Sequence, residues 1–193
     1  MHIHHGEYER RGGWLKLRLE VGVGFAREND MERGRYKFKP RIFGDDVVYM
    51  DLSPPEVNKV GEWVVGDCQM MPFRKHAFSE VYASHVIEHL ERLGKFVWEC
   101  RFVLKLGGKL HLWTPNFLSV NATRDPDHKH VFNFLNIRKV FSKYGFDVHY
   151  ASNVASKLPK PLRYLFKLLF LVFCDELEVV CYKEPLLIMV LWR

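Results

Sequence analysis

VGDCQMMPFRKHAFSEVYASHVIEHL, residues 65–90, is the stretch that decides the predicted fold. An apolar run ends at Val65, Asp67 follows where the strand gives way to a loop, and Pro72 breaks any regular element. Residues 78–83 (FSEVYA) are rich in the β-branched and aromatic residues that strands favour, so they predict a second, short strand. A strand, an acidic loop, a strand and a helix are typical of open α/β folds, in which ligands lie beyond the carboxyl ends of parallel strands.

The second half of this stretch predicts a helix that begins at Ser84, a residue type that often caps helix N-termini. Apolar residues follow at helical spacing: Val86, Ile87, Leu90 and Leu93. We expect the helix to continue over residues 92–106 and to end at the pair Gly107-Gly108, in the manner of a glycine C-cap.

Two more strands are predicted earlier in the chain, and each ends in residues suited to ligand binding. Residues 15–19 alternate and lead into a turn at Gly22 and Gly24, where the absence of a side chain lets a ligand approach the main chain. Residues 47–50 form an apolar strand that ends at Asp51. A carboxylate there can accept hydrogen bonds from a ribose diol, or it can cap the next turn.

The remaining segments complete an alternating pattern of helices and strands. Residues 25–46 show no helical pattern, so an irregular connection is expected there. The later segments are a strand at 109–114, a polar loop at 117–132, a helix at 133–144, a strand at 146–151, an apolar and basic segment at 157–173, and strands at 176–182 and 186–192.

The segment 157–173 has several readings. It could cap a pocket, form a dimer face, pack as an insertion between the last strands, or lie on an anionic membrane. We rank packing or dimer contact above membrane contact, because the apolar face is broad. The longest apolar run, 168–174, is far shorter than the ~20 residues of a membrane span.

Length and composition indicate one domain over residues 1–193, with a flexible N-terminus at 1–13. Hydrophobic residues make up 48% of the chain and charged residues 27%, which is ordinary for a globular protein. The net charge of +6 would suit an anionic partner, but the basic residues are spread along the chain, so no nucleic-acid partner is expected. Four cysteines without a CxxC pair, and no signal peptide, predict a cytoplasmic location.

Two groups of histidines raise the question of a metal site. His2, His4 and His5 lie close together, but no cysteine or carboxylate is spaced to complete a site with them. His85-Val-Ile-Glu88-His89 spells H-x-x-E-H, a zinc peptidase signature. That motif should lie within a helix and not at the start of one, so no metal is predicted.

Four segments, in this order, resemble the class I S-adenosylmethionine-dependent methyltransferases. They are LEVGVG (19–24), VVYMDLSPP (47–55), VVGDCQMMPFRKHAFSEVYASHVIEHL (64–90) and RFVLKLGGKLHLWTPN (101–116). The likeness is nearest to a methyltransferase type 11-like branch often found with surface-polysaccharide genes. It implies a Rossmann-like, doubly wound, mostly parallel seven-stranded sheet with an antiparallel last strand, and S-adenosylmethionine as cofactor.

The resemblance assigns the first cofactor contacts to the ends of the first two strands. Glu20, Gly22 and Gly24 would form the turn under the methionine part of the cofactor. Asp51 would hold the ribose hydroxyls, and Leu52 would lie against the adenine.

The next two strand ends would complete the cofactor site. Asp67 would accept a hydrogen bond from the adenine amino group, with the Cys68 main chain beside it. Ser84 and His85 would close the site next to the sulfonium. Ala26 stands where the family pattern usually has a third glycine.

Methyl transfer is an in-line displacement, so positioning carries much of the catalysis, and a base helps to remove the proton of a hydroxyl acceptor. His85 or His128 is predicted as that base; the alternative is that both histidines only line the pocket. The acceptor is predicted to be a hydroxyl of a small molecule or glycan. A non-catalytic protein that keeps this fold and an RNA methyltransferase are the alternative functions.

Overall fold

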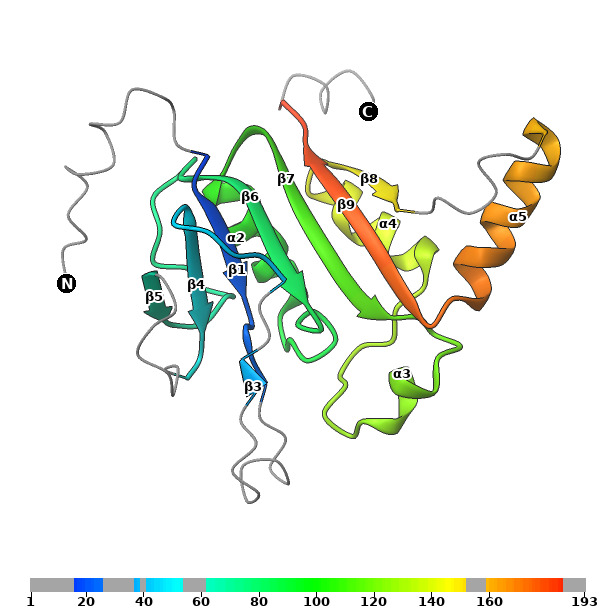
Figure 1. The fold of residues 1–193 in the computed structure, drawn as a ribbon, viewed down its shortest axis with the longest axis horizontal. Coiled ribbons are helices and arrows are strands. Elements are labelled where there is room, and N and C mark those ends of the chain that lie inside the picture. The colour runs from blue at the N-terminus through cyan, green and yellow to red at the C-terminus, as the bar shows by residue number, and fades with distance from the viewer. Residues whose placement is uncertain (1–15, 26–36, 39–40, 54–61, 152–158, 186–193) are drawn as a thin grey trace.

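The computed structural model describes residues 16–25, 37–38, 41–53, 62–151 and 159–185 (Figure 1). Its main sheet has seven strands in the order β5-β4-β1-β6-β7-β9-β8. Strands β5, β4, β1, β6 and β7 are parallel, and β9 runs antiparallel to both β7 and β8. The predicted fold class, a mostly parallel α/β sheet with an antiparallel last strand, is confirmed.

The strands of the structure are β1 Arg18–Val21, β2 Gly24–Phe25, β3 Lys37–Phe38, β4 Val47–Asp51, β5 Glu62–Val65, β6 Phe78–Ser84, β7 Leu104–Pro115, β8 Phe146–Tyr150 and β9 Glu176–Lys183. The helices are α2 Leu93–Val103, α3 Val120–Arg124, α4 Phe134–Lys143 and α5 Lys160–Phe173.

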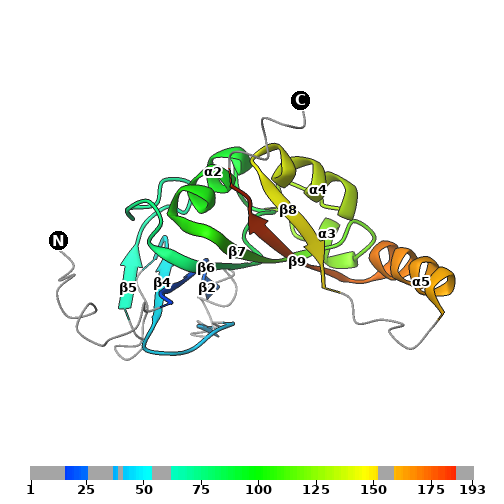
Figure 2. The same ribbon diagram turned by 90° about the horizontal axis from the view of Figure 1, so that it is seen from above.

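The centre of the sheet is buried on both faces. Strand β4 is apolar and buried from Val47 to Met50, as is usual for an inner strand of a parallel sheet. Helices α2 and α4 lie on one face (Figure 2). Phe96 and Cys100 of α2 and Phe141 of α4 are buried in the same apolar core as β1 and β6.

Helix α4 confirms the helix predicted over 133–144. The Asn133 side chain accepts hydrogen bonds from the main chain of Leu135 and Asn136, and the Asn136 side chain accepts one from the main chain of Asn133. This reciprocal pair satisfies donors that a bare helix start would leave unpaired. Gly145, with φ +77°, then turns the chain into β8.

The helix predicted to begin at Ser84 is wrong, because residues 85–92 form turns and α2 begins only at Leu93. His85 has φ +53°, which a right-handed helix cannot contain. Val86, Ile87 and Leu90 are nevertheless buried. Their apolar spacing is therefore explained by a turn that packs on the core.

The predicted glycine C-cap at Gly107 and Gly108 is also wrong. Helix α2 ends at Val103, and β7 begins directly at Leu104. The pairing of β6 with β7 shifts between Phe78–Leu104 and Glu80–Lys109, so the two glycines lie in a bulge of β7. Gly107 has φ +72° there, a conformation that glycine adopts without a steric penalty.

The connection over residues 25–46 contains a two-stranded antiparallel ribbon, in which β2 pairs with β3. No described residue of this connection is helical, in agreement with the prediction. Ala26 lies outside the described residues, as do His2, His4, His5 and the strand predicted at 186–192.

Helix α5 connects β8 to β9 and projects from the side of the sheet (Figures 1 and 2). Most of its described apolar side chains are exposed, namely Leu162, Tyr164, Leu165, Phe166, Leu168, Leu169, Phe170 and Phe173, whereas Leu171 packs against the core. In the described part of the chain, no helix has the length and apolar character needed to cross a bilayer.

Candidate functional site

The candidate site lies at the edge of the sheet where the parallel strands end. Val21 of β1 pairs with Met50 of β4 on one side and with Ala83 of β6 on the other. The Gly66 N–H donates to the Asp51 carbonyl over 2.8 Å, which places the end of β5 beside the end of β4. The direction of strand order reverses at β1 and β6, which is where open α/β sheets bind ligands.

Asp51 and Asp67 follow two neighbouring strands at this edge, because Asp51 ends β4 and pairs with Val65 of β5, two residues before Asp67. Oδ1 of Asp51 accepts from the Ser53 main chain over 3.2 Å, and Oδ1 of Asp67 accepts from the Gln69 main chain over 2.8 Å. Burial first, and then the negative charges of Asp67 and Asp51, raise the pKa of the Cys68 thiol to about 12.

Leu52 projects from this edge, with 72% of its surface exposed. It follows directly on Asp51 at the end of β4. A large apolar side chain in this position is accessible to a flat aromatic ligand.

Glu20 is buried at the end of β1, with 1% of its surface exposed. Its carboxylate accepts hydrogen bonds from the main chain of Arg41, over 2.6 Å, and of Ile42, over 3.1 Å. Burial raises the pKa of Glu20, and these two hydrogen bonds oppose that shift. The carboxylate thus anchors the connection that precedes β4.

Gly22 forms the bend after β1, with φ +68°. A Cβ atom at this position would lie 2.3 Å from Cγ2 of Val86. The space that the glycine leaves is therefore filled by Val86, and a ligand would have to meet the bend through its main chain. Gly24 follows in β2.

Arg41 reaches across the site and was not singled out from the sequence. Its Nε donates to Oγ of Ser84 over 3.0 Å, and its Nη2 lies 3.4 Å from Oε1 of Glu176. The guanidinium also lies over the Trp113 ring, 4.9 Å from the centroid. Arg41 occupies a stretch without periodicity, so no sequence signal marks it.

His85 lies between two carboxylates. Its Nε2 is 2.6 Å from Oε1 of Glu176, and its Nδ1 is 3.2 Å from Oε1 of Glu88. These partners, Glu176 first, raise the pKa of His85 to about 9, and His85 in turn lowers the pKa of Glu176. His85 is therefore a positively charged residue that joins the end of β6 to the start of β9.

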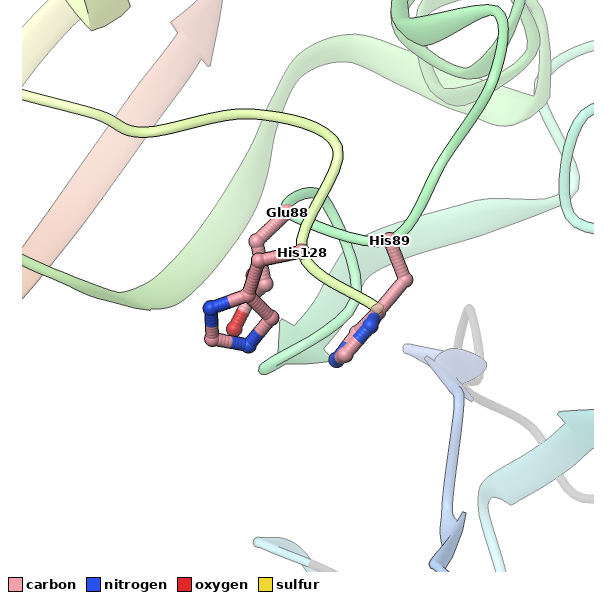
Figure 3. Close-up of side chains that lie close together, drawn as sticks. All are labelled: Glu88, His89 and His128. Atoms are coloured by element: carbon pink, nitrogen blue, oxygen red, sulfur yellow. The ribbon is translucent and has the colours of Figure 1, made fainter. Parts of the chain in front are cut away.

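Glu88, His89 and His128 form a compact group beside this link (Figure 3). Each offers one possible ligand atom, and these atoms lie within 4.8 Å of one another. The zinc peptidase reading of H-x-x-E-H fails because residues 85–89 form no helix and His85 faces Glu176. His128, on the loop between α3 and α4, takes the place beside Glu88 and His89.

A separate cavity of about 490 Å³ opens at the other edge of the sheet. It is lined by Asp147, His149, Tyr150, Ala151, Val180 and Tyr182. These residues belong to β8, β9 and the residue after β8, so this cavity lies away from the ends of β1 and β4.

A family model described as a methyltransferase domain matches residues 19–112, just under half of the chain. No curated protein matches the sequence. Among solved structures, a SAM-dependent methyltransferase from Archaeoglobus fulgidus is similar with a TM-score of 0.58 and 19% identity, over 86% of this chain and 85% of that one.

Two other solved structures show what the same fold supports elsewhere. The phosphoethanolamine N-methyltransferase 2 of Haemonchus contortus, solved with S-adenosyl-L-methionine, gives a TM-score of 0.55 at 15% identity, over 92% of this chain and 51% of that one. The [4+2]-cyclase SpnF gives a TM-score of 0.54 at 14% identity, over 86% of this chain and 74% of that one. The fold is that of class I methyltransferases, and it also occurs in a protein named for a different reaction.

Proposed function

We propose that this chain, which has the class I methyltransferase fold and a matching methyltransferase domain over residues 19–112, transfers a methyl group from S-adenosylmethionine. The observation that carries the proposal is the position of Asp51 and Asp67 at neighbouring strand ends, next to the bend at Gly22. The domain match and the solved neighbours support the same cofactor.

The residues at the strand ends fit an adenosine. Asp51 would accept from the two ribose hydroxyls, and the exposed face of Leu52 would pack on the adenine ring. Asp67 would accept from the adenine amino group, with the Cys68 main chain beside it. Because burial and two carboxylates disfavour its thiolate, Cys68 would contribute its main chain and not a nucleophile.

The methionine end of the cofactor would lie over Gly22 and Gly24. Glu20 holds the nearby main chain of Arg41 and Ile42 through two hydrogen bonds. Ser84 and His85 would border the sulfonium. The cofactor supplies an electrophilic methyl group, and the protein contributes the alignment of the acceptor with it.

We place His85 in a positioning role. Both of its ring nitrogens face carboxylates, so neither offers a lone pair to an acceptor hydroxyl. His128 does keep one, because its Nδ1 donates to the Ala122 carbonyl over 3.1 Å and its Nε2 is left to accept. Of the two histidines, His128 is therefore the one that can assist loss of the acceptor proton.

The acceptor that we propose is a hydroxyl of a small molecule or glycan, and the location that we propose is the cytoplasm. The polysaccharide-associated branch remains part of this proposal and rests on the resemblance of the four segments. A homodimer or a membrane surface would use the exposed side chains of α5.

A protein that keeps the fold without turnover is the competing function. It is favoured by Arg41, whose side chain already contacts Ser84 and Glu176 at the point where the sulfonium would lie. The fold alone does not decide between the two, since fold does not imply function.

Calorimetry with S-adenosylmethionine and its demethylated product tests the proposal. We expect saturable 1:1 binding, weakened at least about 10-fold in Asp51→Asn and in Asp67→Asn, because each loses a charged hydrogen-bond acceptor. Asp147→Asn, at the far edge of the sheet, is the matched control and should bind as the wild type does. Absence of binding at millimolar cofactor would favour the non-catalytic protein.

A further inference from the structure

We propose that Glu88, His89 and His128 bind one divalent metal ion of the zinc type (Figure 3). Two imidazoles and one carboxylate are a donor set that catalytic zinc uses, with its other positions open. The ligands come from two segments, the turn after β6 and the loop between α3 and α4.

The hydrogen bonds of the two histidines fix which nitrogen can bind a metal. Nδ1 of His89 lies 3.3 Å from the Asp127 carbonyl oxygen, and Nδ1 of His128 lies 3.1 Å from the Ala122 carbonyl oxygen. A carbonyl oxygen only accepts, so each Nδ1 carries the proton and each Nε2 holds the lone pair. Metal-binding histidines are held in this way, with the second ring nitrogen donating to a carbonyl or carboxylate.

The carboxylate of Glu88 brings negative charge into the interior, with 1% of the residue exposed. Oε2 accepts from Oγ1 of Thr114 over 3.1 Å, and Oε1 lies 3.2 Å from Nδ1 of His85. A carboxylate oxygen can accept more than one such contact, so a lone pair remains for a metal. His85 already offsets part of the cost of burying this charge, and a bound cation would offset more of it.

The main chain holds the two segments together before any metal arrives. Lys129 N and His130 N both donate to the Glu88 carbonyl, over 2.8 Å and 3.1 Å. Nε2 of His130 lies 2.8 Å from the Leu90 carbonyl oxygen. Ligands on segments fixed in this way lose little freedom on binding, which favours affinity.

Only small movements are needed to form the site. Ligands bonded to zinc at about 2.0–2.2 Å lie roughly 3.3 Å from one another, so atoms within 4.8 Å must move closer. His89 and His128 are half-buried and can turn towards Glu88. Their partly exposed side leaves room for water or an oxygen of a substrate.

The site has a consequence for the acceptor that rests on the proposed function. Because Glu88 also contacts His85, the metal would lie close to the end of β6, where the methyl group is proposed to emerge. A hydroxyl bound to the metal would lose its proton to solvent more easily, and its oxygen would then take the methyl group as the bond to sulfur breaks. His128 would then act as a ligand of the metal, and no separate histidine base would be needed.

Calorimetric titration of the full chain with ZnCl₂, after treatment with a chelator, tests the metal site. All proteins would carry His2→Ala, His4→Ala and His5→Ala, so that these N-terminal imidazoles contribute no binding. We expect one Zn²⁺ per chain, and an affinity lower by at least about 100-fold in His89→Ala and in His128→Ala, since even outer partners of a metal ligand cost 10–100-fold.

Two further variants complete the design. Glu88→Gln keeps an oxygen for Thr114 and removes the charge, so it should weaken Zn²⁺ while far-UV circular dichroism stays unchanged. His149→Ala removes an imidazole that is 58% exposed on β8, away from the cluster, and should leave the affinity unaltered. Cobalt substitution should give the visible absorption of a nitrogen and oxygen site without a thiolate band.

Absence of a stoichiometric ion, or equal affinity in the wild type and both histidine variants, would overturn the metal site. Binding of S-adenosylmethionine to the zinc-free protein is measured in parallel. Cofactor binding without zinc binding would refute this site and leave the proposed function standing, whereas zinc binding without cofactor binding would do the reverse.

Discussion

The main-chain N–H of Arg41 lies 2.6 Å from Oε1 of Glu20, and this contact joins the irregular first connection to the end of β1. The neighbouring N–H of Ile42 donates to the second oxygen of the same carboxylate. Because Glu20 is buried, its carboxylate needs these donors, and the pair of hydrogen bonds holds the main chain of Arg41 and Ile42 at the end of β1.

Glu20→Gln should lower the free energy of unfolding by about 1–3 kcal/mol, because one N–H of Arg41 or Ile42 then faces an amide donor instead of an acceptor. Urea denaturation measures the effect. Glu62→Gln on β5, where the residue is exposed, is the control and should change little. Equal stability of wild type and Glu20→Gln would show that the carboxylate does not anchor this connection.

Gly22→Ala should be destabilising through two separate causes. A Cβ at φ +68° costs about 1 kcal/mol, and its contact at 2.3 Å with Cγ2 of Val86 adds about 1–3 kcal/mol of overpacking. In the double variant with Val86→Ala, the steric part should disappear and the conformational part should remain. Additive effects in this double-mutant cycle would contradict the contact.

The ion pair of Arg18 and Asp46 should make the stability of the fold depend on pH in the acidic range. The guanidinium donates to both Asp46 oxygens, over 2.6 Å and 2.8 Å, and lowers the pKa of the carboxyl. The Asp46 carboxylate therefore binds a proton more readily in the unfolded chain than in the folded one. The contribution of the ion pair to stability is complete above the ordinary aspartate pKa near 3.9, and it is lost as the pH falls through the lower pKa of the folded protein.

Asp46→Asn should accordingly cost about 1 kcal/mol or less at pH 7, because the pair is partly exposed, and the difference from wild type should shrink as the pH falls below the ordinary carboxyl pKa. Thermal melting from pH 7 to pH 2 measures it. Asp45→Asn, its exposed neighbour, is the control. A difference that grows as the pH falls would contradict the assigned sign.

Asn116 should be needed to hold the end of α5 on the sheet. Its Nδ2 lies within hydrogen-bonding distance of three main-chain carbonyls, those of Leu171, Val172 and Cys174, and the residue is fully buried. Asn116→Ala should lower the free energy of unfolding by about 1–3 kcal/mol, since these carbonyls lose a buried donor.

Proteolysis and hydrogen exchange locate the effect of Asn116→Ala. Faster cleavage and exchange confined to residues 159–175 would agree with the role of Asn116. Exposed Asn121, replaced by alanine, is the matched control. Uniform loss of protection along the chain would instead indicate a general role in the core.

The exposed leucines of α5 should mediate self-association. We expect Leu165→Glu with Leu169→Glu to leave unfolding within about 0.5 kcal/mol of wild type, because both side chains are exposed, and to convert a dimer to a monomer in sedimentation velocity. Leu135→Glu, at an exposed leucine on α4, should leave the dimer intact. A wild-type monomer that floats with anionic liposomes would favour the membrane instead.

The sequence by itself determined the strands of the sheet and the acidic residues that follow their carboxyl ends. The inner strand β4 is an apolar run that ends at Asp51, and Asp67 comes two residues after the neighbouring edge strand β5, so local order places both at one edge of the sheet. Helix α4 was also predictable from the sequence, because the residues that cap its start and end its last turn lie next to it in the chain.

The spacing of apolar residues led to a wrong helix prediction where the chain forms turns. Residues 84–90 bury Val86, Ile87 and Leu90, as an amphipathic helix would, but the left-handed conformation of His85 ends that possibility. A periodic pattern reports which side chains are buried and does not report the main-chain path that buries them.

Only the tertiary structure decided which distant groups meet. Arg41 joins Glu20, Ser84 and Glu176 across three strands, and His128 joins His89 through a loop fastened to the Glu88 carbonyl. The physical reason is that such contacts depend on the path of each connection between strands. Local residue preferences set the strands and their ends, whereas long-range hydrogen bonds between connections set the site.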